Sequence, residues 1–183
     1  MFQKPLPRKD RSRKGEIDKE ILTLVDQLNK HPNYYTTSSC AGRIVVLEKQ
    51  RRKCDNRFIF SSHSKAKAEE VVECLSKIGK NPVWFKQESV ILHVCCKDLE
   101  SADRLLDCAR KAGLKHSGII SVKTRIIAEL VGTEAMETLF ATNGKVIAAK
   151  EYVKLLVEEA NRKLATNKKR IELLERILAE ELL

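Results

Sequence analysis

The sequence predicts a non-Rossmann α+β fold: a single domain in which helices pack on a largely antiparallel or mixed sheet, with a helical C-terminal tail. Between residues 58 and 122, short β-branched runs alternate with amphipathic segments in the order β-α-β-β-α-β. That order is typical of helices gathered on one face of a sheet. Apolar residues make up 43% of the 183 residues, enough for a core and too many for a disordered chain.

The elements divide the chain into a basic N-terminal tail (1–14), an α+β core (15–145) and a helical segment (146–183). Within the core, helices are expected at 16–28, at 65–78 with Ser64 as N-cap, and at 99–112 between an Asp98 cap and the Gly113 stop. Strands are expected at 44–48, 58–61, 83–87, 90–96, 119–122, 125–131 and 137–141. Polar residues between the first helix and first strand predict a loop at 33–43, and residues 49–56 predict an exposed basic hairpin or loop.

Apolar residues in the tail recur at alternating spacings of four and three, with Asn167 in the same seam. This rhythm is compatible with a coiled-coil dimer. We favour a helix, broken near Thr166-Asn167, that packs on the chain's own sheet, and therefore a monomer.

The formal net charge is +10, and it is concentrated in three segments, 1–15, 43–57 and 110–125. Such patches are typical of polyphosphate binding, although a generally basic surface would give the same total charge. Aromatic residues make up only 5% of the chain, too few for a platform on which a long single strand would stack. The charge distribution and the low aromatic content therefore favour a folded RNA that is bound through its phosphates over a long single strand.

The six cysteines form no C-x-x-C pair, so zinc-ligand spacing is absent and no metal site is expected. We expect reduced, mostly buried thiols. The apolar runs, such as Ile44–Leu47, are too short to cross a bilayer, and the basic N-terminus lacks the apolar stretch of a secretory signal. These features predict a cytoplasmic protein. The glycine patterns of P-loop and Rossmann nucleotide sites are also absent.

The most unusual segment runs from Thr36 to Arg43, with the sequence T-T-S-S-C-A-G-R. Its small hydroxyl side chains, with Gly42 and Arg43, are suited to binding an anion or the edge of a polar ligand. Cys40 is a candidate nucleophile because the arginine would favour its thiolate. A polar loop that closes against the first helix is the structural alternative.

Two histidines are candidates for proton transfer. His63 follows a predicted strand and precedes a helix, a common position for functional groups, whereas His93 lies inside a strand and is equally explained as a structural histidine. Lys86 and Glu88 share one face of a strand, either as a surface ion pair or as part of a site.

Several motifs together resemble the wybutosine-synthesis N4-methyltransferases that act on phenylalanine tRNA. The most specific is T-T-S-S-C-x-G-R at 36–43, and the others follow in the same order along essentially the whole chain. They are D-x-S-x-K-G-x-x-D at 10–18, Ser62-His63, Lys86-x-Glu88, Leu92-His93-Val94, Ser117-Gly118 and Asn167-Lys168-Lys169-Arg170.

The resemblance implies an S-adenosylmethionine-dependent enzyme that methylates the N4 ring nitrogen of the wyosine-type guanosine beside the anticodon of tRNA(Phe). It implies that Ser38, Ser39 and Arg43, with Lys86, Glu88 and Ser117, hold the methyl donor or the modified base. His63 is then the first candidate for proton acceptor, followed by Cys40 and His93. Lys14 and the basic residues Lys49, Arg51, Arg52 and Lys53 would contact tRNA phosphates. A non-catalytic tRNA-binding protein, or a subunit of a modification complex, is the alternative.

Overall fold

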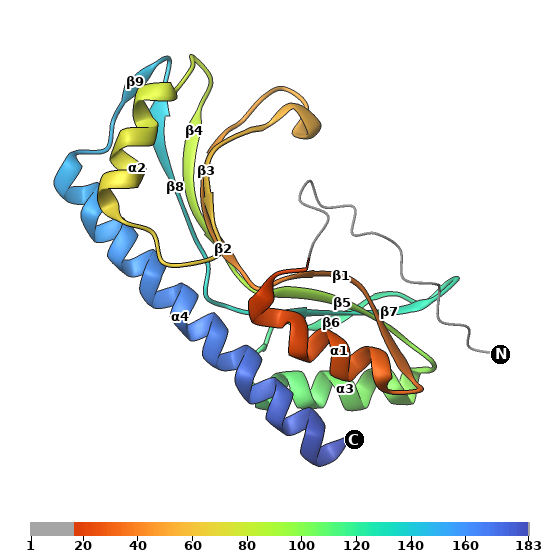
Figure 1. The fold of residues 1–183 in the computed structure, drawn as a ribbon. Helices are drawn as coiled ribbons and strands as arrows, with labels where there is room; N and C mark the ends of the chain where they lie inside the picture. Colours follow the sequence, from red (N-terminus) through yellow and green to blue (C-terminus); the bar gives the residue numbers. More distant parts are fainter. Residues whose placement is uncertain (1–16, 183) are drawn as a thin grey trace. The chain divides into compact units, whose positions relative to one another are not determined.

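The computed structural model describes residues 17–182, and in this range the strands form two antiparallel sheets rather than one (Figure 1). The first sheet has the order β1 (Tyr34–Cys40), β5 (Ile91–Cys96), β7 (Ile126–Val131), β6 (Gly118–Ser121). The second has the order β3 (Arg57–Ser62), β2 (Arg43–Glu48), β4 (Val83–Glu88), β8 (Met136–Thr142), β9 (Lys145–Val146). The α+β class and the antiparallel pairing are confirmed. The β-α-β-β-α-β order is also present, but its strands are divided between the two sheets.

Each sheet belongs to its own compact unit. Unit 1 contains the described residues up to Ala41 together with Val90–Thr133 and the chain from Asn167 onward. Unit 2 contains Gly42–Ser89 and Glu134–Thr166. The chain passes between the units at the β1–β2, β4–β5 and β7–β8 connections and within the C-terminal helix.

In unit 1, helices α1 (Leu22–Lys30) and α3 (Leu99–Lys111) lie on one face of the sheet (Figure 1). Alternate residues of the strands, such as Leu92 and Val94, point into this core. The residues between them, including His93, therefore belong to the opposite face. In β5 and β7, one set of alternate side chains therefore faces the core, and the other set lies on the opposite face of the sheet.

Helix α3 follows the local signals in the sequence closely. The Asp98 carboxylate accepts a hydrogen bond from the backbone N–H of Ser101 (2.8 Å), which caps the first turn as predicted. The interaction with Ser101, through its side chain and then its backbone N–H, holds the pKa of Asp98 below its usual range. Gly113, with φ of 87°, follows the helix in the left-handed conformation that glycine adopts most easily.

Unit 2 has a separate core on one face of its sheet, where Phe85 stacks on Phe140 at 4.9 Å. Helix α2 (Ala68–Cys74) covers this face and continues into a 3-10 turn, η3 (Leu75–Lys77). Its N-cap is Lys67 rather than the predicted Ser64, whose backbone N–H bonds to Ser62 instead. The β2–β3 connection carries another 3-10 turn, η2 (Lys53–Asp55), and confirms the basic hairpin.

The C-terminal helix α4 (Lys150–Glu181) is continuous, so the predicted break near Thr166-Asn167 is wrong. Thr166 keeps the helical backbone and donates its hydroxyl to the Arg162 carbonyl (3.1 Å), which satisfies the side chain without opening the helix. The buried residues of its first part pack in unit 2, and those of its last part, including Leu174 and Leu178, pack in unit 1. This confirms a helix that packs on the chain's own sheets.

No helix among residues 17–182 combines the length and the apolar composition needed to cross a membrane, and α4 is long but strongly charged.

Glu175 on α4 carries a testable pH dependence. Burial raises the pKa of its carboxyl above the usual range, opposed by a hydrogen bond with the backbone of Leu24. Because the raised pKa belongs to the folded state, the folded chain loses stability as pH rises from the ordinary glutamate pKa of about 4.3 through the raised pKa. We expect Glu175→Gln to raise the melting temperature at neutral pH and to leave it unchanged well below pH 4.3. Thermal unfolding across this pH range measures the difference, and an equal gain at both ends would contradict the assignment.

Candidate active site

The segment predicted as a polar loop is largely the edge strand β1, so that expectation is wrong for residues 34–40. Tyr and Thr favour extended backbone, and the edge position leaves hydroxyl side chains in contact with solvent. The register of β1 against β5 shifts between Thr36 and Ser38, which leaves Thr37 as a bulge. The Thr37 hydroxyl donates to the His93 carbonyl (3.3 Å) and ties the bulge to β5.

Three polar side chains line up across the face of the unit 1 sheet that is opposite to α1 and α3. Ser38 pairs with His93 in register, and His93 pairs with Glu129 on β7. Ser38 Oγ lies 3.0 Å from His93 Nδ1, and His93 Nε2 lies 2.8 Å from Glu129 Oε1. Because a carboxylate can only accept, Nε2 carries a proton, and Nδ1 of the neutral ring accepts the serine proton. This is a hydrogen-bonded serine–histidine–carboxylate row.

The other predicted groups of unit 1 take different positions. Cys40 is half-buried at the end of β1, opposite Ile91, while Ser39 is paired with the core residue Leu92 and belongs to the other face from Ser38. Ser117 accepts a hydrogen bond from the Val131 backbone (3.0 Å) and donates to the Leu114 carbonyl (2.7 Å). Its hydroxyl holds the start of β6 beside β7.

The remaining cysteines agree with the expectation of mostly buried thiols. Four are buried and one, Cys54, is exposed. Burial raises the pKa of Cys96 to about 12 and that of Cys74 to about 11, which keeps both as thiols at neutral pH.

In unit 2, Arg43 begins β2 opposite Glu88 of β4. Its Nε bonds to the Glu88 carboxylate, and its guanidinium lies 4.9 Å from the Phe58 ring centre. The Arg43 side chain remains about one third exposed. It is therefore a positioned cation with access to solvent.

Lys86 also lies on this face, and its ammonium bonds to Glu137 (2.6 Å) rather than to Glu88. Lys49 contacts the same carboxylate (3.2 Å) and lies over the Trp84 ring at 4.1 Å. The bond from Lys86 is the main cause that lowers the pKa of Glu137. Lys86 and Glu88 thus share a strand face, as predicted, and each pairs with a different strand.

His63 follows β3 directly, and its Nδ1 donates to the Gly42 carbonyl (3.2 Å). The neutral ring then has its lone pair on Nε2. His63 belongs to unit 2, whereas Ser38, His93 and Glu129 belong to unit 1.

The basic hairpin exposes Arg51 and Arg52. Its base is held by Asn56, whose side-chain oxygen accepts from the Gln50 backbone (2.8 Å). Lys53 opens the turn η2 in the same connection. Lys14 lies outside the described residues.

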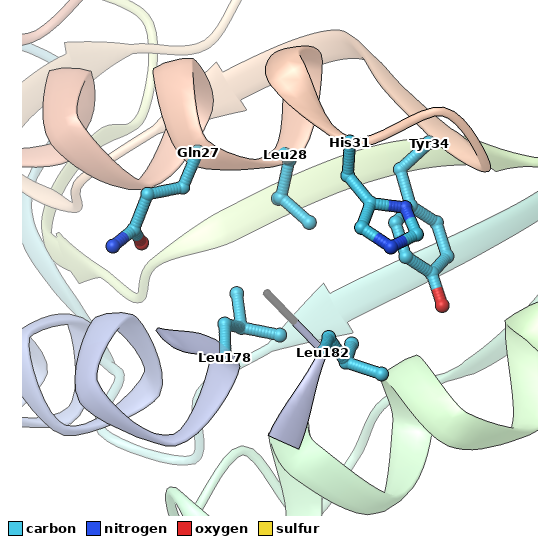
Figure 2. A pocket seen from close by; sticks show the side chains of 6 residues that line it. All are labelled: Gln27, Leu28, His31, Tyr34, Leu178 and Leu182. Carbon is cyan, nitrogen blue, oxygen red and sulfur yellow. The ribbon is translucent and has the colours of Figure 1, made fainter. Parts of the chain in front are cut away.

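The hollow drawn in Figure 2 lies in unit 1 between α1 and the end of α4. Leu28, Leu178 and Leu182 point into it, and His31 and Tyr34 close one side (Figure 2). It holds only about 10 Å³, room for about one water molecule, whereas pockets for drug-sized ligands begin at roughly 300 Å³. The hollow is too small for a nucleoside-sized ligand.

Sequence reasoning missed Glu129 and Glu137, the carboxylates that position His93 and Lys86. Both lie in predicted strands, and Glu129 alternates with the core residues Ala128 and Leu130. The alternation would have placed Glu129 on the face of the sheet opposite to the core. Its pairing with His93 depends on a strand register that alternation does not contain.

Comparison with known proteins places the chain in a family. A sequence profile of the family described as Methyltransferase TYW3 matches residues 2–180. The chain belongs to the TYW3 methyltransferase family.

Relatives in this family come from archaea and vertebrates. The chain is 37% identical over 166 residues to a Pyrococcus furiosus protein named tRNA(Phe) 7-((3-amino-3-carboxypropyl)-4-demethylwyosine(37)-N(4))-methyltransferase 1, covering 89% of this chain and 85% of the relative. It is 35% identical over 170 residues to a Xenopus laevis protein named tRNA wybutosine-synthesizing protein 3 homolog, covering 88% of this chain and 66% of the relative.

Solved structures agree with the TYW3 fold. A Pyrococcus horikoshii protein matches with a TM-score of 0.83 at 36% identity, covering 90% of this chain and 86% of that one. An Aeropyrum pernix protein matches with a TM-score of 0.79 at 26% identity, covering 90% of this chain and 99% of that one. The resemblance inferred from the T-T-S-S-C-x-G-R segment is confirmed at the level of family and fold.

Proposed function

We propose that this TYW3 methyltransferase transfers a methyl group from S-adenosylmethionine to the N4 ring nitrogen of a wyosine-type guanosine beside the anticodon of tRNA(Phe). The similarity to relatives named for this reaction carries the proposal. Those from Pyrococcus furiosus and Methanocaldococcus jannaschii are 37% and 35% identical over 89% and 83% of this chain. The polar row of unit 1 and the exposed cations of unit 2 support the proposal, because they are suited to proton transfer and to phosphate contacts, respectively.

The side chains present suit a methyl donor of this class. S-adenosylmethionine supplies a methyl group activated by its sulfonium centre, and it carries a carboxylate, an ammonium and two ribose hydroxyls. In unit 2, Arg43 is a partly exposed guanidinium suited to a carboxylate, and Glu88 is suited to an ammonium or to hydroxyls. These donors and acceptors fit the polar groups of the donor.

The test is methyl transfer to a defined substrate. Purified protein is incubated with S-adenosylmethionine labelled in its methyl group and with tRNA(Phe) that carries the 4-demethylwyosine-type base. We expect the label at N4, identified by mass spectrometry of the isolated nucleoside. tRNA(Phe) with an unmodified guanosine at the same position is the control. Calorimetric titration with the donor shows whether it binds. Binding of tRNA without donor binding or methylation would contradict the proposal and support the non-catalytic alternative.

The basic hairpin provides a prediction about tRNA binding. The affinity for a nucleic acid falls as salt rises, and each phosphate contact that is lost makes the plot of log affinity against log salt shallower by about 0.7 to 0.9. We expect the double variant Arg51→Ala/Arg52→Ala to make this plot shallower by about 1.5, because both side chains are exposed on the hairpin. Affinity for tRNA(Phe) measured over a salt series gives the slope.

A double variant of exposed lysines on α4, Lys150→Ala/Lys154→Ala, is the matched control, since it removes the same charge from the same unit. Equal slopes for the two double variants would remove the hairpin from the tRNA interface.

A further inference from the structure

We propose that the row Ser38–His93–Glu129 is the proton path of the methyl transfer, with Glu129 as the residue that positions His93. The inference rests on the proposed function and deepens it by assigning the path taken by the proton of the substrate nitrogen. It also assigns a role to Glu129, which no motif in the sequence singles out.

The geometry defines the direction of each hydrogen bond. Glu129 Oε1 accepts from His93 Nε2 (2.8 Å), which selects the tautomer with its lone pair on Nδ1. That nitrogen lies 3.0 Å from Ser38 Oγ, so it accepts the serine proton. The serine oxygen is left with lone pairs for a proton donor that approaches the exposed end of the row. The order of roles is that of a serine–histidine–carboxylate set, with the ring nitrogens exchanged.

The fold holds these groups in place without loops. All three residues are in strand pairs, and the bulge at Thr37 brings Ser38 into register with His93. Gly118 of β6 pairs with Glu129 as the fourth member of the row, and a side chain there would meet open space. Gly118 of β6 therefore leaves open space beside the Glu129 end of the row.

The proton balance is simple. As N4 forms its bond to the methyl carbon, the bond between that carbon and the donor sulfur breaks. The N4 proton passes to Ser38 Oγ, and the serine proton passes to His93 Nδ1. The positive charge that leaves the sulfonium thus ends on the imidazolium, next to the Glu129 carboxylate. Glu129 stabilises the charge that develops and is not itself protonated.

Stability alone does not explain this row. The side chains of His93 and Glu129 are 28% and 30% exposed, and pairs with such access to solvent contribute little to folding. The three groups also lie on the face away from the core of unit 1. A chemical role accounts for a row of matched donors and acceptors at this position.

The test replaces the carboxylate and keeps its shape. We expect Glu129→Gln to lower kcat by about 10²- to 10⁴-fold with little change in KM, because binding groups remain while the imidazolium loses its counter-charge. Glu129→Asp should recover part of the loss. Glu100→Gln is the matched control, since Glu100 is an exposed carboxylate on α3 that pairs with Arg104.

A second readout does not depend on activity. Nitrogen NMR of His93, assigned by comparison with His93→Gln, should show a neutral ring protonated at Nε2 in the wild-type protein and a mixture of tautomers in Glu129→Gln. A ring protonated at Nδ1 in the wild-type protein would overturn the proposal. So would a kcat for Glu129→Gln within twofold of the Glu100→Gln control. If the wild-type protein methylates no tRNA, the proposed function fails, and the NMR result separates that failure from the state of the row.

Discussion

Replacing His93 by alanine should reduce the rate of methyl transfer by about 10²- to 10⁴-fold, the usual contribution of a positioned proton acceptor. In this variant Ser38 loses the nitrogen that takes its proton, and the charge that develops during the reaction loses its site. Single-turnover rates with saturating donor and 4-demethylwyosine-type tRNA(Phe) measure the effect on chemistry apart from product release.

His63→Ala is the informative comparison, because the sequence pattern ranks His63 before His93 as proton acceptor. His63 donates Nδ1–H to the Gly42 backbone carbonyl, whereas His93 donates Nε2–H to the Glu129 carboxylate and faces Ser38 through Nδ1. We expect His63→Ala to lower the rate by less than tenfold. A loss for His63→Ala that exceeds the loss for His93→Ala would move the proton acceptor to His63.

Replacing Phe140 by alanine should lower the free energy of unfolding by about 3–5 kcal/mol. Phe140 on β8 is fully buried and stacks on Phe85, so its removal deletes both apolar contacts and an aromatic pair in the core of unit 2. The neighbouring strands pair on both sides of β8 and limit collapse into the cavity. Urea unfolding followed by circular dichroism measures the loss.

Leu155→Ala is the control for this prediction. Leu155 lies on α4 in the same unit and is 62% exposed, so its truncation removes little buried surface. We expect a change below about 1 kcal/mol. Similar losses for the two variants would mean that Phe140 does not anchor the core of unit 2.

Local signals predicted much of the secondary structure. The α3 helix begins at its Asp98 cap and ends before Gly113, because both signals act through hydrogen bonds and backbone angles within a few residues. The strand β5 also follows its predicted range, since alternation of polar and apolar residues is a local property. The predicted break near Asn167 was wrong. A polar residue among apolar ones suggests that the helix is interrupted, but α4 buries Asn167 and continues through it.

The loop predicted for residues 34–40 was wrong for a different reason. Its hydroxyl-rich composition resembles a loop, yet β1 is an edge strand whose backbone pairs with β5. Pairing with a strand more than fifty residues away contributes hydrogen bonds that composition does not reveal. The sequence predicts Ser38 and His93 as candidate site residues, but it does not predict the hydrogen bond between them.

The sequence by itself determined the α+β class, the amphipathic helices and the family, because these depend on local periodicity, caps and a short specific motif. Only the tertiary structure decided that the strands form two sheets, and that Ser38, His93 and Glu129 lie in one row. The physical reason is that strand register is set by pairing between distant segments, and a shift of one residue would turn these side chains to the other face.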